Sequence, residues 1–296
     1  MISILIPTYN YDITTLVTRL VEQLEQSKVA FEILVLDDAS TNQEIKIKNK
    51  EISSFENCFL IENAENQGRT ATRQALAEKA NNQWLLFMDA DVLPKNNDFI
   101  KKFDVENQIS DVVFGGISYE EQKPEKEKVL RWKYGKAREA KPVAERKKMP
   151  HLSIISQCFL IQKKVFLQAN DFHDNVYGVD VLFAQNLEKM KTTVQHIDNP
   201  IVHLGLESSA QFIEKSKKGL QSLYRFEKET KITNDYRPIQ KAYRSLERNK
   251  LDSFFMKSMQ LFEKSIFKNL QSSNPSLFLF DLYRLYFFTK LHHTKA

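Results

Sequence analysis

Residues 84–92 read Trp-Leu-Leu-Phe-Met-Asp-Ala-Asp-Val, and this stretch decides the fold that we predict for the chain. Five consecutive apolar residues are typical of a strand buried on both faces, as in a parallel sheet. The run ends on Asp89 and Asp91, and burying carboxylates costs free energy unless a cation compensates their charge. Because residues two apart in a strand point the same way, both aspartates can face one divalent cation. Alternatively, either aspartate caps the turn that follows.

Strand and helix patterns alternate on both sides of this stretch. Such alternation indicates an α/β fold with a mostly parallel central sheet flanked by helices. We expect strands at residues 2–6, 31–36, 58–61, 111–114 and 154–161, and helices at residues 14–26, 44–55 and 70–80. Residues 120–150 are rich in charge, and we expect a mobile loop there, either a solvated linker or a flap over an acceptor. Trp132 and Tyr134 in this loop can stack on sugar rings or anchor the loop to the core.

Polar side chains follow several of the expected strands. Because the carboxyl ends of parallel strands meet at one edge of a sheet, these side chains should converge on one crevice. Carboxylates suit a base, a ribose and a metal, whereas arginines suit phosphate oxygens, so the set predicts a nucleotide diphosphate site. The sequence contains neither G-x-G-x-x-G nor G-x-x-x-x-G-K, which argues against dinucleotide-binding proteins and P-loop NTPases. The residues of the expected crevice are Pro7, Thr8, Tyr9, Asp37, Asp38, Arg69, Arg73, Asp89, Ala90 and Asp91.

Four motifs in this order resemble the family 2 glycosyltransferases, inverting enzymes of the GT-A fold found in bacteria. They are Ile-Pro-Thr-Tyr-Asn at 6–10, Leu-Asp-Asp-Ala-Ser at 36–40, Asn-Gln-Gly-Arg at 66–69 and Phe-Met-Asp-Ala-Asp at 87–91. The resemblance covers residues 1–210 and implies a nucleotide-sugar donor, with a UDP-sugar favoured, and a divalent cation, Mn²⁺ or Mg²⁺. It implies that Asp91 binds the metal, and that the other crevice residues bind the nucleotide sugar.

Two further residues take their expected roles from this resemblance. The family usually shows Gly-x-Glu-Asp where this chain has Gly-Val-Asp at residues 178–180, so Asp180 is expected to be the catalytic base. Its alternative role is to favour the start of a helix, and Asp174 would then be the next candidate base. His203 is expected to complete the metal site, where an imidazole beside carboxylates suits Mn²⁺ somewhat better than Mg²⁺. Otherwise His203 is a core residue at a strand end.

Composition and charge suggest a catalytic domain at 1–210 and a basic, aromatic-rich helical extension at 211–296. The chain has 296 residues, 42% of them hydrophobic, which argues against global disorder. The extension carries 17 Lys and Arg against 8 Asp and Glu, whereas residues 1–210 carry 26 against 30. A basic segment of this kind suggests an anionic partner. Nucleic acid fits poorly, because no recognition motif accompanies the charge.

The aromatic stretch at 277–288 has two interpretations. It either packs as core or lies on anionic lipid as an interfacial helix, and the basic flanks favour contact with lipid. No signal peptide pattern and no apolar stretch of about 18 residues occurs, and Cys58 and Cys158 form no disulfide framework. We therefore expect a cytoplasmic protein at the inner face of the cytoplasmic membrane.

The function expected is metal-dependent, inverting transfer of a sugar to a hydroxyl of a glycan or lipid-linked acceptor, in polysaccharide biosynthesis of the cell envelope. A catalytically impaired nucleotide-sugar-binding protein is an alternative, because Val179 replaces the usual Glu. A sugar nucleotidyltransferase fits less well, since it would need a Gly-rich loop bearing Lys or Arg after the first strand.

Overall fold

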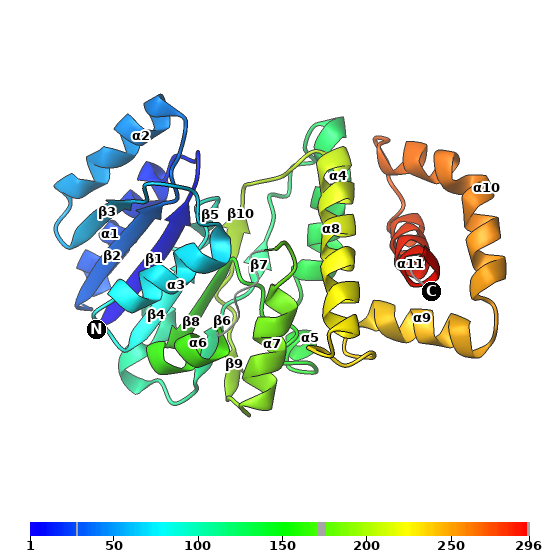
Figure 1. Ribbon diagram of the computed structural model, residues 1–296. Coiled ribbons are helices and arrows are strands. Elements are labelled where there is room, and N and C mark those ends of the chain that lie inside the picture. Colours follow the sequence, from blue (N-terminus) through cyan, green and yellow to red (C-terminus); the bar gives the residue numbers. More distant parts are fainter. Residues whose placement is uncertain (28, 171–175, 295–296) are drawn as a thin grey trace. The chain divides into compact units, whose positions relative to one another are not determined.

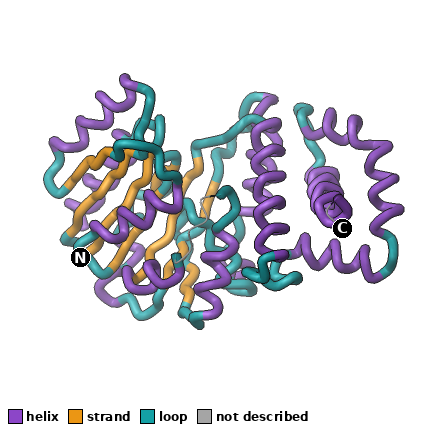
Figure 2. Tube along the Cα trace, viewed as in Figure 1, coloured by secondary structure: helices purple, strands orange, loops and turns teal. Residues whose placement is uncertain are grey.

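The computed structural model describes residues 1–27, 29–170 and 176–294 (Figures 1 and 2). Asp174, the alternative base, lies outside these residues. The chain forms two compact units. The sheet unit comprises Met1–Glu120, Glu139–Asn175 and Phe183–Gly205, and the helical unit comprises Glu121–Arg138, Val176–Leu182 and Leu206–Ala296. The last crossing between the two units lies between Gly205 and Leu206, and the domain boundary that we expect at residue 210 stays a prediction.

In the described residues, the central sheet of the sheet unit has seven strands in the order β3-β2-β1-β4-β8-β6-β9. The strands β1 to β4 are mutually parallel, whereas β8 runs antiparallel to both β4 and β6. Strand β4 lies in the middle, and its side chains from Leu85 to Met88 are fully buried, as the apolar run predicts. The bounds are β1 Ile2–Thr8, β2 Phe31–Asp37, β3 Cys58–Glu62, β4 Trp84–Met88, β6 Val112–Phe114, β8 Cys158–Gln162 and β9 Val194–His196.

Helices flank this sheet on both sides, and the predicted fold class is confirmed. In Figure 1, α3 and α6 cover the face of the sheet that is turned toward the reader. Helix α1 buries Leu16, Leu20 and Leu24, which its 3.6-residue period places on one side. The bounds are α1 Thr14–Ser27, α2 Gln43–Asn49, α3 Arg69–Lys79, α6 Lys163–Ala169 and α7 Asp180–Lys189, and a 3₁₀ turn at Lys50–Ser54 extends α2.

A small second sheet lies beside the central one and has the order β5-β10-β7. It consists of β5 Val92–Pro94, β10 Ile201–His203 and β7 Ile117–Ser118. Strand β5 follows Asp91 directly, and β10 pairs with it antiparallel, so that His203 stands opposite Val92. This pairing brings together two residues that are more than a hundred positions apart in the chain.

The expectation of a mobile loop at 120–150 is wrong. A 3₁₀ turn at Lys126–Lys128, α4 (Val129–Tyr134), a π-helical turn at Gly135–Glu139 and α5 (Val143–Arg146) occupy it. Val129, Leu130 and Arg131 are buried. The charged residues alternate with apolar ones at helical spacing, and tertiary packing orders the segment. Tyr134 packs against aromatic rings of the helical unit, which favours its role as an anchor.

The helical unit is built around its last helix. It contains α8 (Ser209–Lys228), α9 (Pro238–Arg248), α10 (Asp252–Leu270) and α11 (Leu277–Thr294). Helix α11 packs against α8, α9 and α10, and its Phe280, Tyr283 and Tyr286 are buried in one apolar cluster with residues of α4, α8 and α10. The core interpretation is therefore correct for these side chains, and their contact with lipid is not. None of the described helices is both long and apolar enough to cross a membrane.

Candidate functional site

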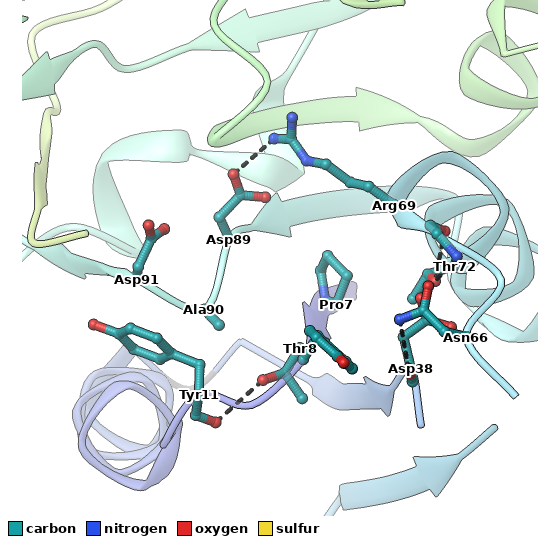
Figure 3. Close-up of a pocket in the computed structure, with 12 residues that line it drawn as sticks. Pro7, Thr8, Tyr11, Asp38, Asn66, Arg69, Thr72, Asp89, Ala90 and Asp91 are labelled. Carbon is teal, nitrogen blue, oxygen red and sulfur yellow. Dashed lines mark hydrogen bonds and ion pairs between the residues drawn. The ribbon is translucent and has the colours of Figure 1, made fainter. Parts of the chain in front are cut away.

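A pocket of about 350 Å³ opens in the sheet unit at the carboxyl ends of β1, β2 and β4 (Figure 3). Parallel strands deliver their carboxyl ends to one edge, which is where such sheets bind ligands. Most of the expected crevice residues lie here together. The lining consists of Pro7, Thr8, Tyr9, Tyr11, Asp38, Asn66, Gly68, Arg69, Thr72, Asp89, Ala90 and Asp91. Asp37, Arg73 and His203 do not line the pocket, although all three belonged to the expected site.

The paired aspartates at the end of β2 have different surroundings. Asp37 is buried, and one of its carboxylate oxygens accepts the backbone N–H of Ser40 at 2.8 Å. Asp38 lines the pocket and accepts the backbone N–H groups of Gln67 and Gly68, both at 2.8 Å. It also accepts the side-chain amide of Asn63 at 2.9 Å. Asp37 therefore holds its own turn, while Asp38 fixes the loop before α3 on the pocket wall.

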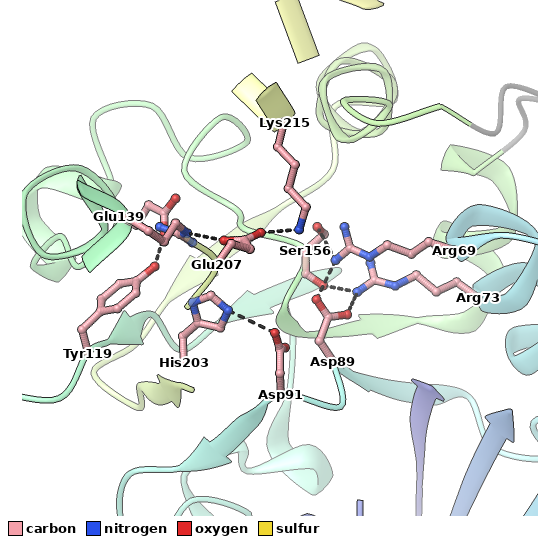
Figure 4. Close-up of polar contacts among 11 residues, drawn as sticks. Arg69, Arg73, Asp89, Asp91, Tyr119, Glu139, Ser156, His203, Glu207 and Lys215 are labelled. Atoms are coloured by element: carbon pink, nitrogen blue, oxygen red, sulfur yellow. Dashed lines mark hydrogen bonds and ion pairs between the residues drawn. The ribbon is translucent and has the colours of Figure 1, made fainter. Parts of the chain in front are cut away.

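Asp89 is held by two arginines from successive turns of α3 (Figure 4). Arg69 donates to one carboxylate oxygen at 2.7 Å and Arg73 to the other at 2.5 Å. The Arg73 side chain is only 7% exposed, and it lies over the rings of Phe87 and Phe159. The Arg69 side chain is 43% exposed and lines the pocket. The geometry thus separates a buried arginine that orients Asp89 from an accessible one beside the pocket.

Asp91 lies beside His203, because the strand β5 that follows Asp91 pairs with β10, which ends at His203 (Figure 4). The His203 Nε2 atom lies 3.2 Å from an Asp91 carboxylate oxygen, and His203 is buried. Burial acts to raise the pKa of Asp91, but the hydrogen bond and the charge of His203 outweigh it and hold that pKa below its usual value. A Cβ atom at Gly205 would stand 1.9 Å from the same carboxylate oxygen, so a larger residue there would displace the Asp91 side chain from its place beside His203.

The donor set of Asp91 and His203 fits one divalent cation. Carboxylate oxygen and imidazole nitrogen are both ligands of Mn²⁺, and such ions usually complete their coordination with water and substrate phosphates. Within the described ranges, no group of three His, Cys, Asp or Glu side chains could hold a metal without such help. These two residues would therefore hold the ion only together with ligands from outside the protein.

Asp180 lies in the helical unit and begins α7. It is exposed and stands in the first helical turn, where a carboxylate is favoured by the helix dipole. Its charge acts on the guanidinium of Arg237 in the same unit. Its assignment as catalytic base stays a prediction.

The family model described as glycosyl transferase family 2 matches residues 3–169, which span β1 to α6 and every residue that lines the pocket. The chain belongs to this family. Its structural neighbours are GT-A glycosyltransferases, and the predicted fold is confirmed.

Two curated relatives are similar over about a third of the chain. A glycosyltransferase of Haemophilus influenzae described as uncharacterized is 33% identical over 110 residues, 37% of this chain and 41% of its own length. A poly(ribitol-phosphate) beta-glucosyltransferase of Bacillus spizizenii is 34% identical over 121 residues, 39% of this chain and 19% of its own length. In both cases the match spans less than half of the relative.

Two solved structures share the fold at low sequence identity. A mannosyltransferase from Pyrobaculum calidifontis, in complex with GDP-Man and Mn²⁺, is 18% identical with a TM-score of 0.54, covering 76% of this chain and 64% of its own. A glucosyl-3-phosphoglycerate synthase from Mycobacterium tuberculosis, in complex with Mg²⁺ and UDP, is 12% identical with a TM-score of 0.51, covering 75% and 78%. These likenesses concern the fold alone.

Four pocket residues were not among those expected from the sequence: Tyr11, Asn66, Gly68 and Thr72. Asn66 and Gly68 stand in the Asn-Gln-Gly-Arg motif, so the signal was present in the residues before Arg69. Tyr11 lies in the loop between β1 and α1, and burial, with the charge of Asp91 nearby, raises the pKa of its hydroxyl. Only the folded chain places that hydroxyl near Asp91.

Proposed function

We propose that this protein is an inverting, metal-dependent glycosyltransferase that moves a sugar from a nucleotide-diphosphate donor to an acceptor hydroxyl. The observation that carries the proposal is the pocket at the sheet edge, where Asp38, Arg69, Asp89 and Asp91 gather inside the matched family region. Carboxylates and a guanidinium on one wall suit a ligand with hydroxyl donors at one end and phosphates at the other.

On this proposal, the charged side chains in and beside the pocket have different roles in binding the donor. Asp38 and Asp89 accept hydrogen bonds from the base and the ribose of the nucleotide. The base that we prefer is uracil. Arg69 is close enough to solvent to leave Asp89 and donate to the diphosphate, while Arg73 keeps Asp89 in place. Asp91 and His203 would hold Mn²⁺ or Mg²⁺, which when bound neutralises charge on the departing diphosphate.

The second part of the reaction concerns the acceptor and its deprotonation. Asp180 would take the proton from the acceptor hydroxyl as its oxygen attacks the anomeric carbon from the side opposite the diphosphate, which inverts that centre. The acceptor would be a glycan or a lipid-linked sugar of the cell envelope at the inner face of the cytoplasmic membrane. The Bacillus relative is named as a glucosyltransferase for poly(ribitol-phosphate), which supports a polymeric acceptor.

Metal-dependent nucleotide binding tests the proposal. Calorimetry with UDP and with GDP, each with and without Mn²⁺, should show binding of one nucleotide that strengthens at least tenfold with the metal. Asp91→Ala should abolish the gain from metal, because it removes a direct ligand. Asp98→Ala, the same change at an exposed aspartate outside the pocket, should leave the gain intact.

A panel of nucleotide sugars with Mn²⁺ then identifies the donor through slow hydrolysis. If neither nucleotide binds in the presence of metal, the proposed function is wrong. An unchanged gain from metal in Asp91→Ala would remove that residue from the metal site.

A further inference from the structure

Helix α10 turns a row of large apolar side chains toward solvent. Phe254 is 72% exposed, Leu261 81% and Phe262 60%. Single exposed apolar residues are common, but three on one helix form a patch of the kind that marks an interaction site. The inner side of the same helix already packs against protein, because Met259, Ile266 and Leu270 are buried in the core cluster of the helical unit. In Figure 1, α10 stands on the side of α11 that faces away from α8.

Helical geometry places lysines beside this row. Residues follow each other by about 100° around an α-helix, so Phe254 and Leu261 lie two turns apart and about 20° from one another. Lys257, Lys264 and Lys268 all lie on one flank of them, within about 80° of Phe254. The three lysines are exposed. Among the residues that the structure describes, none of the three forms an ion pair.

This combination of charge and apolar surface selects the partner. A second copy docking by two-fold symmetry would bring the lysines of both chains close together, which is unfavourable. An anionic lipid surface accepts both features, because the rings and the leucine enter the boundary of the acyl chains while the ammonium groups stay among the headgroup phosphates. Lysines near such a surface are attracted by its negative potential.

We propose that the outward face of α10, defined by Phe254, Leu261, Phe262, Lys257, Lys264 and Lys268, docks the protein on an anionic membrane surface. This proposal moves the lipid contact that we expect at 277–288 to another helix, since Phe280, Tyr283 and Tyr286 of α11 are buried in the core cluster. The inference rests on the proposed function only for its purpose, which is to bring the enzyme to a lipid-linked acceptor.

Vesicle sedimentation of the full-length protein tests this surface without donor or acceptor. Binding to vesicles of phosphatidylcholine with 30% phosphatidylglycerol should be at least tenfold tighter than to phosphatidylcholine alone, and should weaken with salt. The double variant Phe254→Gln/Leu261→Gln should lose at least tenfold, the scale for burying one such side chain. Replacing the lysines by Gln should cost about fivefold for each. Ile47→Gln, at a 68% exposed position on α2, is the matched control and should bind like the wild type.

Three results would overturn the inference. The first is wild-type protein that fails to sediment with the anionic vesicles, and the second is a double variant that sediments as well as the wild type. The third is a wild-type dimer in light scattering that the double variant dissociates, which would make this face a contact between copies. Nucleotide binding by the same variants should stay normal. A negative result in vesicle sedimentation would therefore leave the proposed function standing. A failure to bind nucleotide would likewise leave the membrane contact standing.

Discussion

Arg69 and Arg73 reach the same carboxylate from adjacent turns of α3, but they differ in exposure. Arg73 is enclosed by aromatic rings and also donates to the backbone carbonyl of Ser156. Moving it would leave a buried charge unpaired, which costs several kcal/mol. Arg69 is 43% exposed, and Asp89 keeps its ion pair with Arg73 if Arg69 turns toward another anion. Two residues with the same chemistry thus differ in role: Arg73 supports Asp89, and Arg69 is accessible to a ligand.

The role of Asp180 is decided by separating catalysis from helix stability. Asp180→Asn keeps the size of the side chain and is expected to leave the fold and nucleotide affinity unchanged. Transfer should fall by roughly 10²-fold or more, the usual scale for losing a general base. Single-turnover transfer and the melting temperature are to be measured together. Asp252→Asn, the same change in the first turn of α10, serves as control. Near-native transfer by Asp180→Asn would show that another group takes the proton.

At the scale of single elements, α11 shows how one helix can satisfy a strongly aromatic sequence by packing. Its apolar side chains point to nearly all sides, because neighbouring helices surround it. Tyr134 of α4 and Phe212 of α8 both contact Phe280. The ring centroids are 5.7 and 5.3 Å apart, within the range in which aromatic pairs attract each other.

Two phenylalanines on α11 give a matched test of this packing. Phe280 is 1% exposed and Phe278 is 69% exposed. Phe280→Ala should lower the free energy of unfolding by about 3–5 kcal/mol, since it leaves a cavity in the core cluster. Phe278→Ala should change it by less than about 0.5 kcal/mol, as surface substitutions usually do. Urea unfolding followed by circular dichroism measures both, and equal effects of the two would refute the central place of α11.

At the scale of the whole molecule, each of the two units contains a histidine with a buried side chain and a lowered pKa, and its protonation in acid should destabilise the fold. Burial, with the nearby charges of Arg146 and Lys147, lowers the pKa of His196 to about 4 in the sheet unit. Burial, with Arg244 and Lys228, lowers the pKa of His292 to about 4 in the helical unit. An unfolded histidine titrates near 6.5, so between these values the unfolded chain binds more protons than the folded one.

The free energy of unfolding that depends on these two histidines should therefore be highest above pH 6.5 and should decrease as the pH falls toward 4. For His196 the loss between pH 7 and pH 5 is about 2 kcal/mol. Fluorescence of Trp84 in a Trp132→Phe background reports the sheet unit alone, because each unit holds one of the two tryptophans. Adding His196→Gln should flatten the pH dependence of unfolding in that background. An unchanged slope would assign the acid sensitivity to other groups.

Local sequence was sufficient for the sheet and its polar edge. A continuous apolar run such as 84–88 is stable only when it is buried on both faces, and alternation with helices favours the parallel pairing of β1 to β4. The parallel strands β1 to β4 bring the groups that follow them to one edge, so the chain order predicts that Asp38, Arg69, Asp89 and Asp91 lie in one pocket.

Tertiary structure alone decided the pairings between distant segments. His203 meets Asp91 because β10 runs antiparallel to β5, and no local pattern specifies that register. Arg73 faces Asp89 rather than the pocket because Phe87 and Phe159 enclose it. The aromatic residues of α11 are equally compatible with lipid and with a core, since both remove apolar surface from water. Only the neighbouring helices determine that Phe280, Tyr283 and Tyr286 are buried in protein, and that the outward face of α10 stays exposed.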